Sequence, residues 1–154
     1  MRILIDGYSL LHNWPELAPG QPRHSERARN ELIEMLTQYH DATGEPVTVF
    51  FDGQGSRSSK SPKPADARAV EVLFSRSGQT ADDMIERAAH RFREFGEVLV
   101  VTDDSVERDV VTGFGASVAG CGNFIQMIAN ALKDLQEDLR IHNRTEQNRF
   151  KRSR

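Results

Sequence analysis

The stretch VLVVTDD (residues 98–104) decides the fold class of this 154-residue chain. Its first five residues form an unbroken apolar and β-branched run, which is typical of a strand buried on both faces in the middle of a parallel sheet. Asp103 and Asp104 follow this strand directly. Because ligands of parallel α/β sheets bind beyond the carboxyl ends of the strands, both aspartates are candidate site residues.

Strand-like and helix-like segments alternate on both sides of this stretch, which predicts an α/β domain with a mostly parallel sheet and right-handed crossovers. Helical periodicity and stop signals predict helices from about Ser25 to Thr43 and from Thr80 to about Phe95. The segment DGYS (6–9) is expected to be a loop. The direction of the strand at 70–74 stays open, because no helix is evident before it. The other expected elements are strands at 2–5, 47–51 and 116–120, a short helix at about 106–112, and a last helix carrying Phe124 to Leu139.

Size and composition favour one globular domain. Hydrophobic residues make up 38% of the chain and charged residues 28%, values that exclude disordered and fibrous classes. No apolar run approaches the roughly 20 residues that cross a bilayer, so we expect no membrane partner. Cys121 is the only cysteine, and the chain starts without a leader-like segment. These features predict a cytoplasmic protein.

Charge is unevenly distributed along the chain. The net charge is −3, yet residues 140–154 carry six Arg or Lys residues and one Glu, which leaves −8 on the rest. The sequence is therefore divided into a domain at 1–140 and a basic tail at 141–154. Such an asymmetry indicates contact with nucleic acid, although a solvated terminus has the same composition.

Several carboxylates are expected at one edge of the sheet. Asp6 follows the first strand and Asp52 follows the second, as Asp103 and Asp104 follow the fourth. The helix that starts at Thr80 must run back toward the fourth strand. Its first turn, with Asp82 and Asp83, therefore starts at the same edge.

Such a cluster needs a counter-charge. Two like charges about 4 Å apart repel by roughly 4 kcal/mol at an effective dielectric constant of 20, so protons or a cation must neutralise them. Oxygen ligands without Cys or His favour Mg²⁺ or Mn²⁺. Such an ion binds phosphate oxygens and lowers the pKa of water, which is the chemistry of phosphodiester hydrolysis.

Each acid also has a structural interpretation. Asp83, three residues after Thr80, fits a capping box, which leaves Asp82 free to face the rim. Asp52 suits a turn, and Asp103 or Asp104 can cap the next helix. Asp6, at the end of a buried strand, is the hardest to explain structurally. The histidines are scattered and predict no site: His12, His24, His40, His90 and His142.

Four segments resemble, in order and spacing, the YacP-like NYN domains of the PIN-like ribonuclease superfamily. They are ILIDGYSLLH, VTVFFDG, VEVLFSRSGQTADDMIER and VLVVTDDSVERD. The resemblance covers roughly residues 1–140. It implies a three-layer PIN-like fold with strand order about 3-2-1-4-5, and the activity of a metal-dependent endoribonuclease.

The resemblance also implies roles for particular residues. Asp6, Asp82 and Asp104 match the catalytic acids that bind Mg²⁺ or Mn²⁺, with Asp83 or Asp103 as additional ligands. Ser9 stands where the family usually has Asn, and its hydroxyl can still bond a carboxylate. The residues expected to contact substrate are Ser9, Asp52, Arg57, Lys60 and Lys63.

The implied partner is RNA, single-stranded and either free or on the ribosome, with the basic tail adding a salt-dependent contact. A non-catalytic RNA- or ribosome-binding module is the alternative, and Ser9 is the feature that allows it. A phosphatase of the haloacid dehalogenase type would need a second acid at position 8, which is Tyr8.

Overall fold

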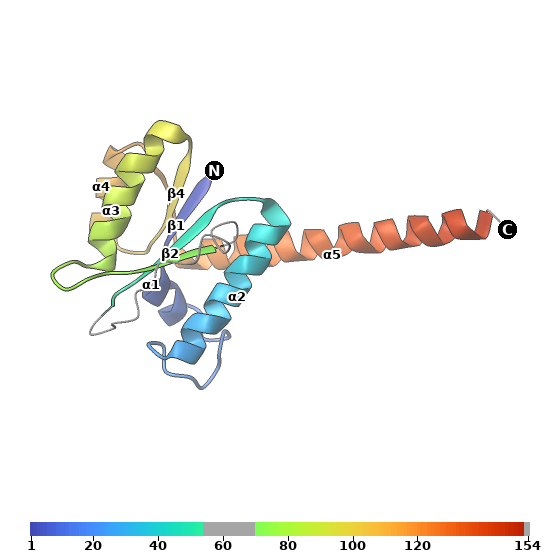
Figure 1. Cartoon of the computed structure of the whole chain (residues 1–154), viewed down its shortest axis with the longest axis horizontal. Helices are drawn as coiled ribbons and strands as arrows, with labels where there is room; N and C mark the ends of the chain where they lie inside the picture. Colours follow the sequence, from blue (N-terminus) through green and yellow to red (C-terminus); the bar gives the residue numbers. More distant parts are fainter. Residues whose placement is uncertain (54–69, 153–154) are drawn as a thin grey trace.

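The computed structural model describes residues 1–53 and 70–152 and contains a five-stranded sheet in the order β3-β2-β1-β4-β5 (Figure 1). Every pair of neighbouring strands is parallel, including β2 and β3, so the open direction of the third strand is settled. The predicted fold class and strand order are thus confirmed. The strands are β1 (Arg2–Asp6), β2 (Val47–Phe51), β3 (Val70–Phe74), β4 (Val98–Val101) and β5 (Ser117–Ala119).

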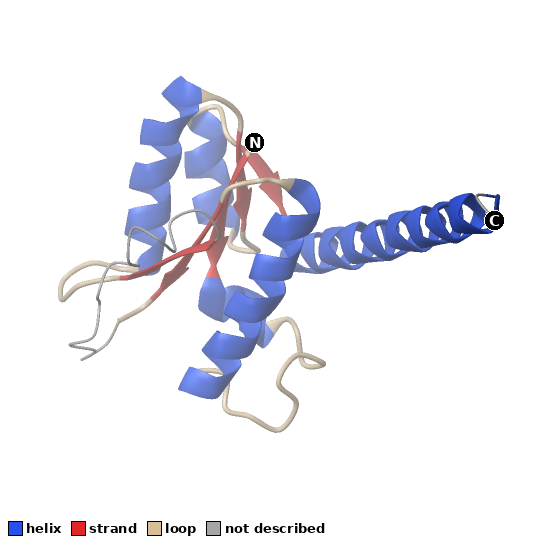
Figure 2. Cartoon of the chain, turned by 45° about the vertical axis from the view of Figure 1, so that its right-hand side comes forward, coloured by secondary structure: helices blue, strands red, loops and turns tan. Residues whose placement is uncertain are grey.

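Helices cover both faces of the sheet and make a three-layer arrangement (Figure 2). One face packs against α1, α2 and the start of α5, and the other packs against α3 and α4. A short 3-10 turn, Arg93–Phe95, follows α3 and ends at Gly96. The helices are α1 (Gly7–His12), α2 (Glu26–Thr43), α3 (Ala81–Phe92), α4 (Ser105–Gly113) and α5 (Cys121–Arg152).

The central strand contributes to two cores. In β1, Ile3 and Ile5 face α1, α2 and α5, while Leu4 faces α3 and α4. All three side chains are fully buried. Because both faces of the strand are covered, the sequence is apolar without alternation, as the parallel arrangement requires. The carboxyl end of β1 is thereby fixed in the middle of the sheet edge.

The expected loop at DGYS is wrong, because residues 7–12 form the helix α1. Asp6 caps this helix by accepting a hydrogen bond from the backbone N–H of Ser9 (3.2 Å). Gly7 lies so close to Phe51 that an added Cβ would overlap its ring. A glycine here therefore allows the chain to turn directly from strand into helix against the core.

The last helix is much longer than its apolar pattern predicts. It continues through residues 141–152 without a break at the expected domain boundary. Phe124 and Ile128 pack into the core, whereas the side chains of residues 133–149 are exposed. Figure 1 shows this part of α5 extending away from the sheet. Across the described residues, no helix has the length and apolar character needed to cross a bilayer.

Candidate metal centre

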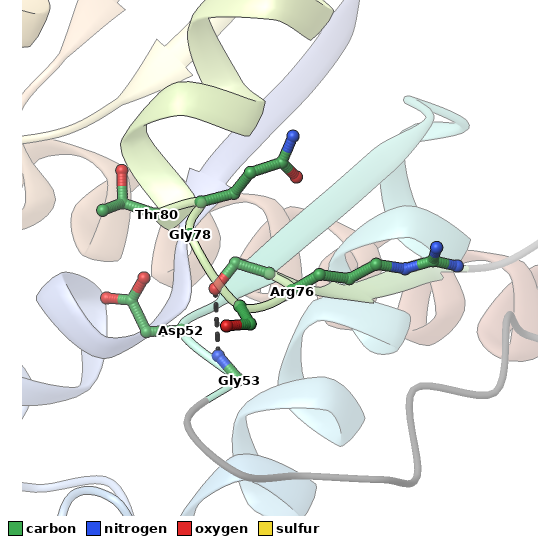
Figure 3. A pocket seen from close by; sticks show the side chains of 8 residues that line it. Asp52, Gly53, Arg76, Gly78 and Thr80 are labelled. Carbon is green, nitrogen blue, oxygen red and sulfur yellow. Dashed lines mark hydrogen bonds between the residues drawn. The ribbon is translucent and has the colours of Figure 1, made fainter.

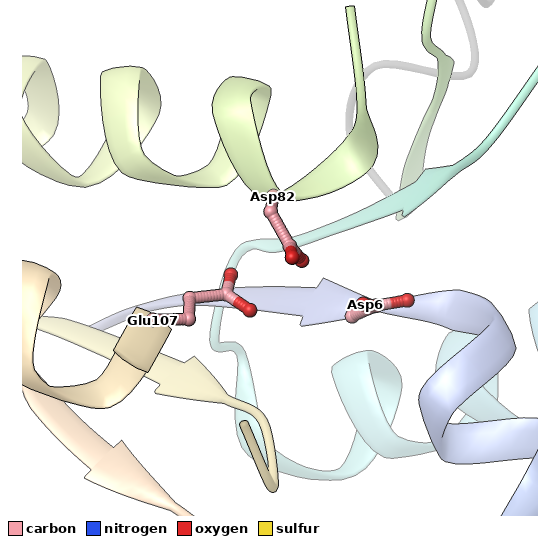
Figure 4. Close-up of side chains that lie close together, drawn as sticks. All are labelled: Asp6, Asp82 and Glu107. Atoms are coloured by element: carbon pink, nitrogen blue, oxygen red, sulfur yellow. The ribbon is translucent and has the colours of Figure 1, made fainter. Parts of the chain in front are cut away.

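Three carboxylates meet at the carboxyl edge of the sheet: Asp6, Asp82 and Glu107 (Figure 4). One oxygen of each lies within 4.8 Å of an oxygen of each of the others. Asp6 ends β1, Asp82 is the second residue of α3, and Glu107 is the third residue of α4. Three segments spread over about two thirds of the sequence thus supply one site.

Glu107 is the most deeply buried of the three, with 2% of its surface exposed. Its Oε2 accepts a hydrogen bond from the hydroxyl of Thr102 (3.0 Å). Its Oε1 is buried and has no hydrogen-bond donor within reach in the described part of the chain. A buried carboxylate oxygen without a partner costs free energy, so a proton or a cation is expected there.

The raised pKa of Glu107 shows that its surroundings disfavour a negative charge on this carboxyl. Burial, and then the nearby carboxyl of Asp82, raise the pKa of Glu107 to about 9, while the Thr102 bond opposes this. Without a cation, Glu107 therefore keeps its proton at neutral pH.

Asp6 is half-buried and faces the same pair. Burial raises its pKa, the hydrogen bonds from the backbone and side chain of Ser9 lower it, and the charges of Asp82 and Asp52 raise it again. The net direction of the pKa shift is upward. Ser9, predicted to contact substrate, is thus seen to orient Asp6, and its contact with substrate stays a prediction.

The donor set fits a hard divalent cation. All three carboxylates offer oxygen, and one of them has a buried oxygen without a partner. Within the described residues, no Lys, Arg or His forms an ion pair with any of the three carboxylates. A hard divalent cation such as Mg²⁺ or Mn²⁺ suits this kind of site, because its charge can replace the proton and its coordination can satisfy the unpartnered oxygen.

Asp104 was predicted as a main ligand, but the structure does not place it among the three. Its Oδ1 accepts hydrogen bonds from the backbone N–H groups of Val106 (2.9 Å) and Glu107 (3.3 Å), so it caps α4. Asp83 forms the predicted capping box with Thr80. Both acids hold helix starts at this edge, and their ligand roles stay predictions.

Two further predicted acids also anchor helices. Asp103 Oδ1 accepts from the backbone N–H of Cys121 (2.9 Å) at the start of α5. Asp52 Oδ1 accepts from the backbone N–H of Ala81 (2.7 Å), the residue before Asp82. Asp52 therefore joins the end of β2 to the start of α3 and fixes the position of Asp82.

A cavity of about 560 Å³ opens beside this junction (Figure 3). Asp52 lines it together with Gly53 and residues 75–80. The backbone N–H of Gly53 donates to the hydroxyl of Ser75 (3.1 Å), which joins the ends of β2 and β3. The basic residues predicted to contact substrate lie outside the described residues: Arg57, Lys60 and Lys63.

Glu107 was missed from the sequence because its spacing suits another role. It lies three residues after Asp104, the spacing of a capping box, in which a glutamate turns back to the helix start. A signal was nevertheless present. The helix after the fourth strand starts at the carboxyl edge of the sheet, so its first turn, like that of α3, places a carboxylate at the rim.

Comparisons with known proteins agree with this architecture. A sequence profile of the YacP-like NYN domain matches residues 3–154. The uncharacterised protein YacP of Bacillus subtilis (strain 168) is 32% identical over 115 residues, which cover 74% of this chain. The match spans 66% of the length of that relative, slightly less than two thirds. Two crystal structures of Rae1 (YacP) from Bacillus subtilis are also similar, each at 26% identity. One has a TM-score of 0.77 and coverage of 99% of this chain and 88% of that one. The other, a tryptophan-to-leucine mutant, has a TM-score of 0.76 and coverage of 93% and 83%.

Proposed function

Since this chain belongs to the YacP-like NYN domain family, we propose that it is a metal-dependent endoribonuclease that hydrolyses phosphodiester bonds of RNA. The proposed cofactor is Mg²⁺ or Mn²⁺, and the proposed ligands are Asp6, Asp82 and Glu107. The observation that carries the proposal is the orphaned, buried Oε1 of Glu107 within a group of three carboxylates. Such a group has few uses in folding, since its charges oppose the packing around it.

Residues around the site favour the binding of a cation. Glu107 must be ionised to act as a ligand, so binding of a cation would release the proton that Glu107 otherwise holds. Ser9 and Asp52 orient the other parts of the site, one by bonding Asp6 and the other by holding the start of α3. When bound, the ion would lower the pKa of water and stabilise negative charge on the phosphate.

The charge of the site would influence RNA binding. RNA is a polyanion and would be repelled by ionised carboxylates, so a cation held by these carboxylates would favour the approach of a phosphate. The exposed cationic residues of α5, among them Arg140 and Arg144, would add sequence-independent contacts with RNA phosphates. Single-stranded RNA, free or on the ribosome, is the proposed substrate.

The test is cleavage of single-stranded RNA by the full-length chain in Mn²⁺ or Mg²⁺. We expect Asp6→Asn and Glu107→Gln each to lower the cleavage rate by more than about 100-fold, because each removes an ion ligand and not an outer contact. Asp109→Asn is the matched control, since Asp109 is an exposed acid on the same helix as Glu107. It should cleave like the unmodified chain.

Two results would overturn the proposal. Equal cleavage by the unmodified chain and Glu107→Gln would remove the three-carboxylate group from the reaction. RNA binding without cleavage in either metal would instead favour the non-catalytic RNA-binding module.

A further inference from the structure

Two histidines that are scattered in the sequence lie side by side in the structure. His12 ends α1, and His24 lies in the segment that leads into α2. Their Nε2 atoms are 3.4 Å apart, while their ring centroids are 5.3 Å apart. The Nε2 edges of the two imidazoles therefore face one another. Both side chains are exposed, so water and ions reach this point.

The separation of the two nitrogens is informative. The two nitrogens can form a long hydrogen bond, in which one ring donates and the other accepts according to their tautomers. Two Zn–N bonds of about 2.1 Å that meet at a tetrahedral angle place their nitrogens about 3.4 Å apart. The observed distance therefore suits two ligands of one metal ion without movement of either ring.

We propose that His12 and His24 form a binding site for a divalent transition-metal ion of the zinc type. The site shares no residue with the three-carboxylate group and does not depend on nuclease activity. Imidazole nitrogens bind Zn²⁺ much more strongly than Mg²⁺, whereas carboxylate oxygens are the ligands that Mg²⁺ uses. Two protein ligands leave the remaining coordination positions of the ion to water.

The positions of both histidines are fixed by neighbouring residues. The ring of His24 packs on Tyr8, with 4.2 Å between centroids, and Arg29 donates to both the Tyr8 hydroxyl (3.2 Å) and the His24 carbonyl (2.8 Å). His12 is held by the last turn of α1. Ligands that are fixed before binding lose little conformational freedom when the ion arrives, which favours affinity.

Arg23, the residue before His24, fixes the intervening segment. Its guanidinium donates hydrogen bonds to five backbone carbonyls, those of Leu11, Trp14, Leu17, Ala18 and Gln21. The loop between the two histidines is therefore closed without any ion. A metal at the histidines would join the end of α1 to the start of α2 and stabilise the folded chain by mass action.

The test is a Zn²⁺ titration of the full-length chain, followed by calorimetry and by imidazole ¹⁵N resonances, in excess Mg²⁺ to compete for the carboxylates. We expect one equivalent of Zn²⁺ to bind and to shift the Nε2 resonances of His12 and His24 only. His12→Ala and His24→Ala should each weaken binding at least tenfold, an effect typical of losing one of two ligands. His142→Ala, an exposed histidine on α5, is the control and should bind Zn²⁺ normally.

The spectra of the unmodified chain keep the proposal falsifiable even where a variant folds poorly. Zn²⁺ that leaves the two Nε2 resonances in place would overturn it. So would binding that survives in both histidine variants but is lost in Asp82→Asn, since the ion would then lie at the carboxylates.

Discussion

The charge of Glu107 depends on what occupies the space beside its Oε1. Without a cation, burial and the nearby Asp82 favour the protonated form. In the unfolded chain the same carboxyl would titrate at its ordinary value of 4.5. Because the folded pKa is the higher one, the folded chain binds a proton that the unfolded chain has already released at neutral pH.

This difference predicts how stability changes with pH in metal-free protein. The free energy of unfolding should fall as the pH rises from about 4.5 toward about 9, since Glu107 keeps its proton only in the folded chain. Glu107→Gln cannot titrate and should flatten this slope. Urea unfolding of the unmodified chain and of Glu107→Gln, in buffer with a chelator at pH 5, 7 and 8.5, measures the two slopes. Parallel slopes for the two proteins would show that Glu107 is ionised in the fold.

Asp52 predicts a second effect at the level of a single residue. Asp52→Ala removes the acceptor for the Ala81 N–H and should cost about 1 kcal/mol of stability, the typical value for removing a helix cap. Asp52→Asn keeps an acceptor and should lose less. Because Ala81 precedes Asp82, Asp52→Ala should also weaken Mn²⁺ binding about tenfold, as removal of an orienting hydrogen bond does.

Urea unfolding and Mn²⁺ calorimetry separate these two roles of Asp52. Asp41→Ala, an exposed acid on α2, is the control for loss of surface charge. If Asp52→Ala lost stability but bound Mn²⁺ normally, Asp52 would hold the helix without positioning the ligand.

At the level of elements, the edge of the sheet is a meeting point of helix starts. Asp6 caps α1, Asp104 caps α4, and Asp103 bonds the first N–H of α5, while Asp52 does the same for α3. The positive ends of these helix dipoles favour negative charge. They therefore make it less costly to hold three carboxylates at one point.

Asp104 tests whether an acid at this edge caps a helix or binds the ion. Asp104→Ser keeps a good N-cap, so we expect stability and Mn²⁺ affinity close to those of the unmodified chain. Asp104→Ala should lose about 1 kcal/mol of stability. Urea unfolding and Mn²⁺ calorimetry give both quantities. A decrease in Mn²⁺ affinity greater than about tenfold in Asp104→Ser, the size expected for a ligand, would make Asp104 part of the metal centre.

Long apolar patterns made most elements predictable. Apolar patterns that are typical of buried strands and of a buried helix face predicted the strands at 47–51 and 98–101 and the helix α2. The six-residue helix α1 was missed, since it is too short to show a period and depends on a cap and on Gly7 packing against Phe51. The direction of β3 depends on tertiary packing and could not be predicted from its five residues.

The sequence predicted where the site lies but not all of the residues that form it. The rule that strand ends share one edge brought Asp6 and Asp82 together from the sequence alone. It could not tell which acids at that edge point inward, because that depends on side-chain direction at each helix start. Glu107 takes the inward position, and Asp104 uses its Oδ1 to bond two backbone N–H groups.

At the scale of the whole molecule, α5 combines two different segments in one helix. Its start belongs to the core, and the part after Leu132 has exposed side chains throughout residues 133–149. The ion pair between Arg149 and Glu146 (3.6 Å) lies on that exposed surface, where such pairs add little stability. The exposed half is therefore expected to serve binding of a partner, not folding of the domain.

Deletion of residues 141–154 tests this separation. These residues carry five Arg or Lys and one Glu, and the described side chains among them are exposed. We therefore expect the free energy of unfolding to change by less than about 0.5 kcal/mol. Affinity for single-stranded RNA should fall, and the slope of log K against log salt should become shallower by about 0.7 for each RNA phosphate that the tail neutralises. Urea unfolding and RNA titrations at three salt concentrations measure both effects.

The charge of the exposed half can be separated from its length by a matched variant. Arg144→Gln combined with Arg149→Gln in the intact chain keeps the helix but removes two cations, so its salt slope should be shallower by about 1.4. An unchanged salt slope in both this variant and the deletion would place the RNA-binding surface elsewhere. Residues that only bind a partner leave the free energy of unfolding nearly unchanged. A large loss of stability in the deletion would therefore mean that the exposed half of α5 stabilises the folded domain.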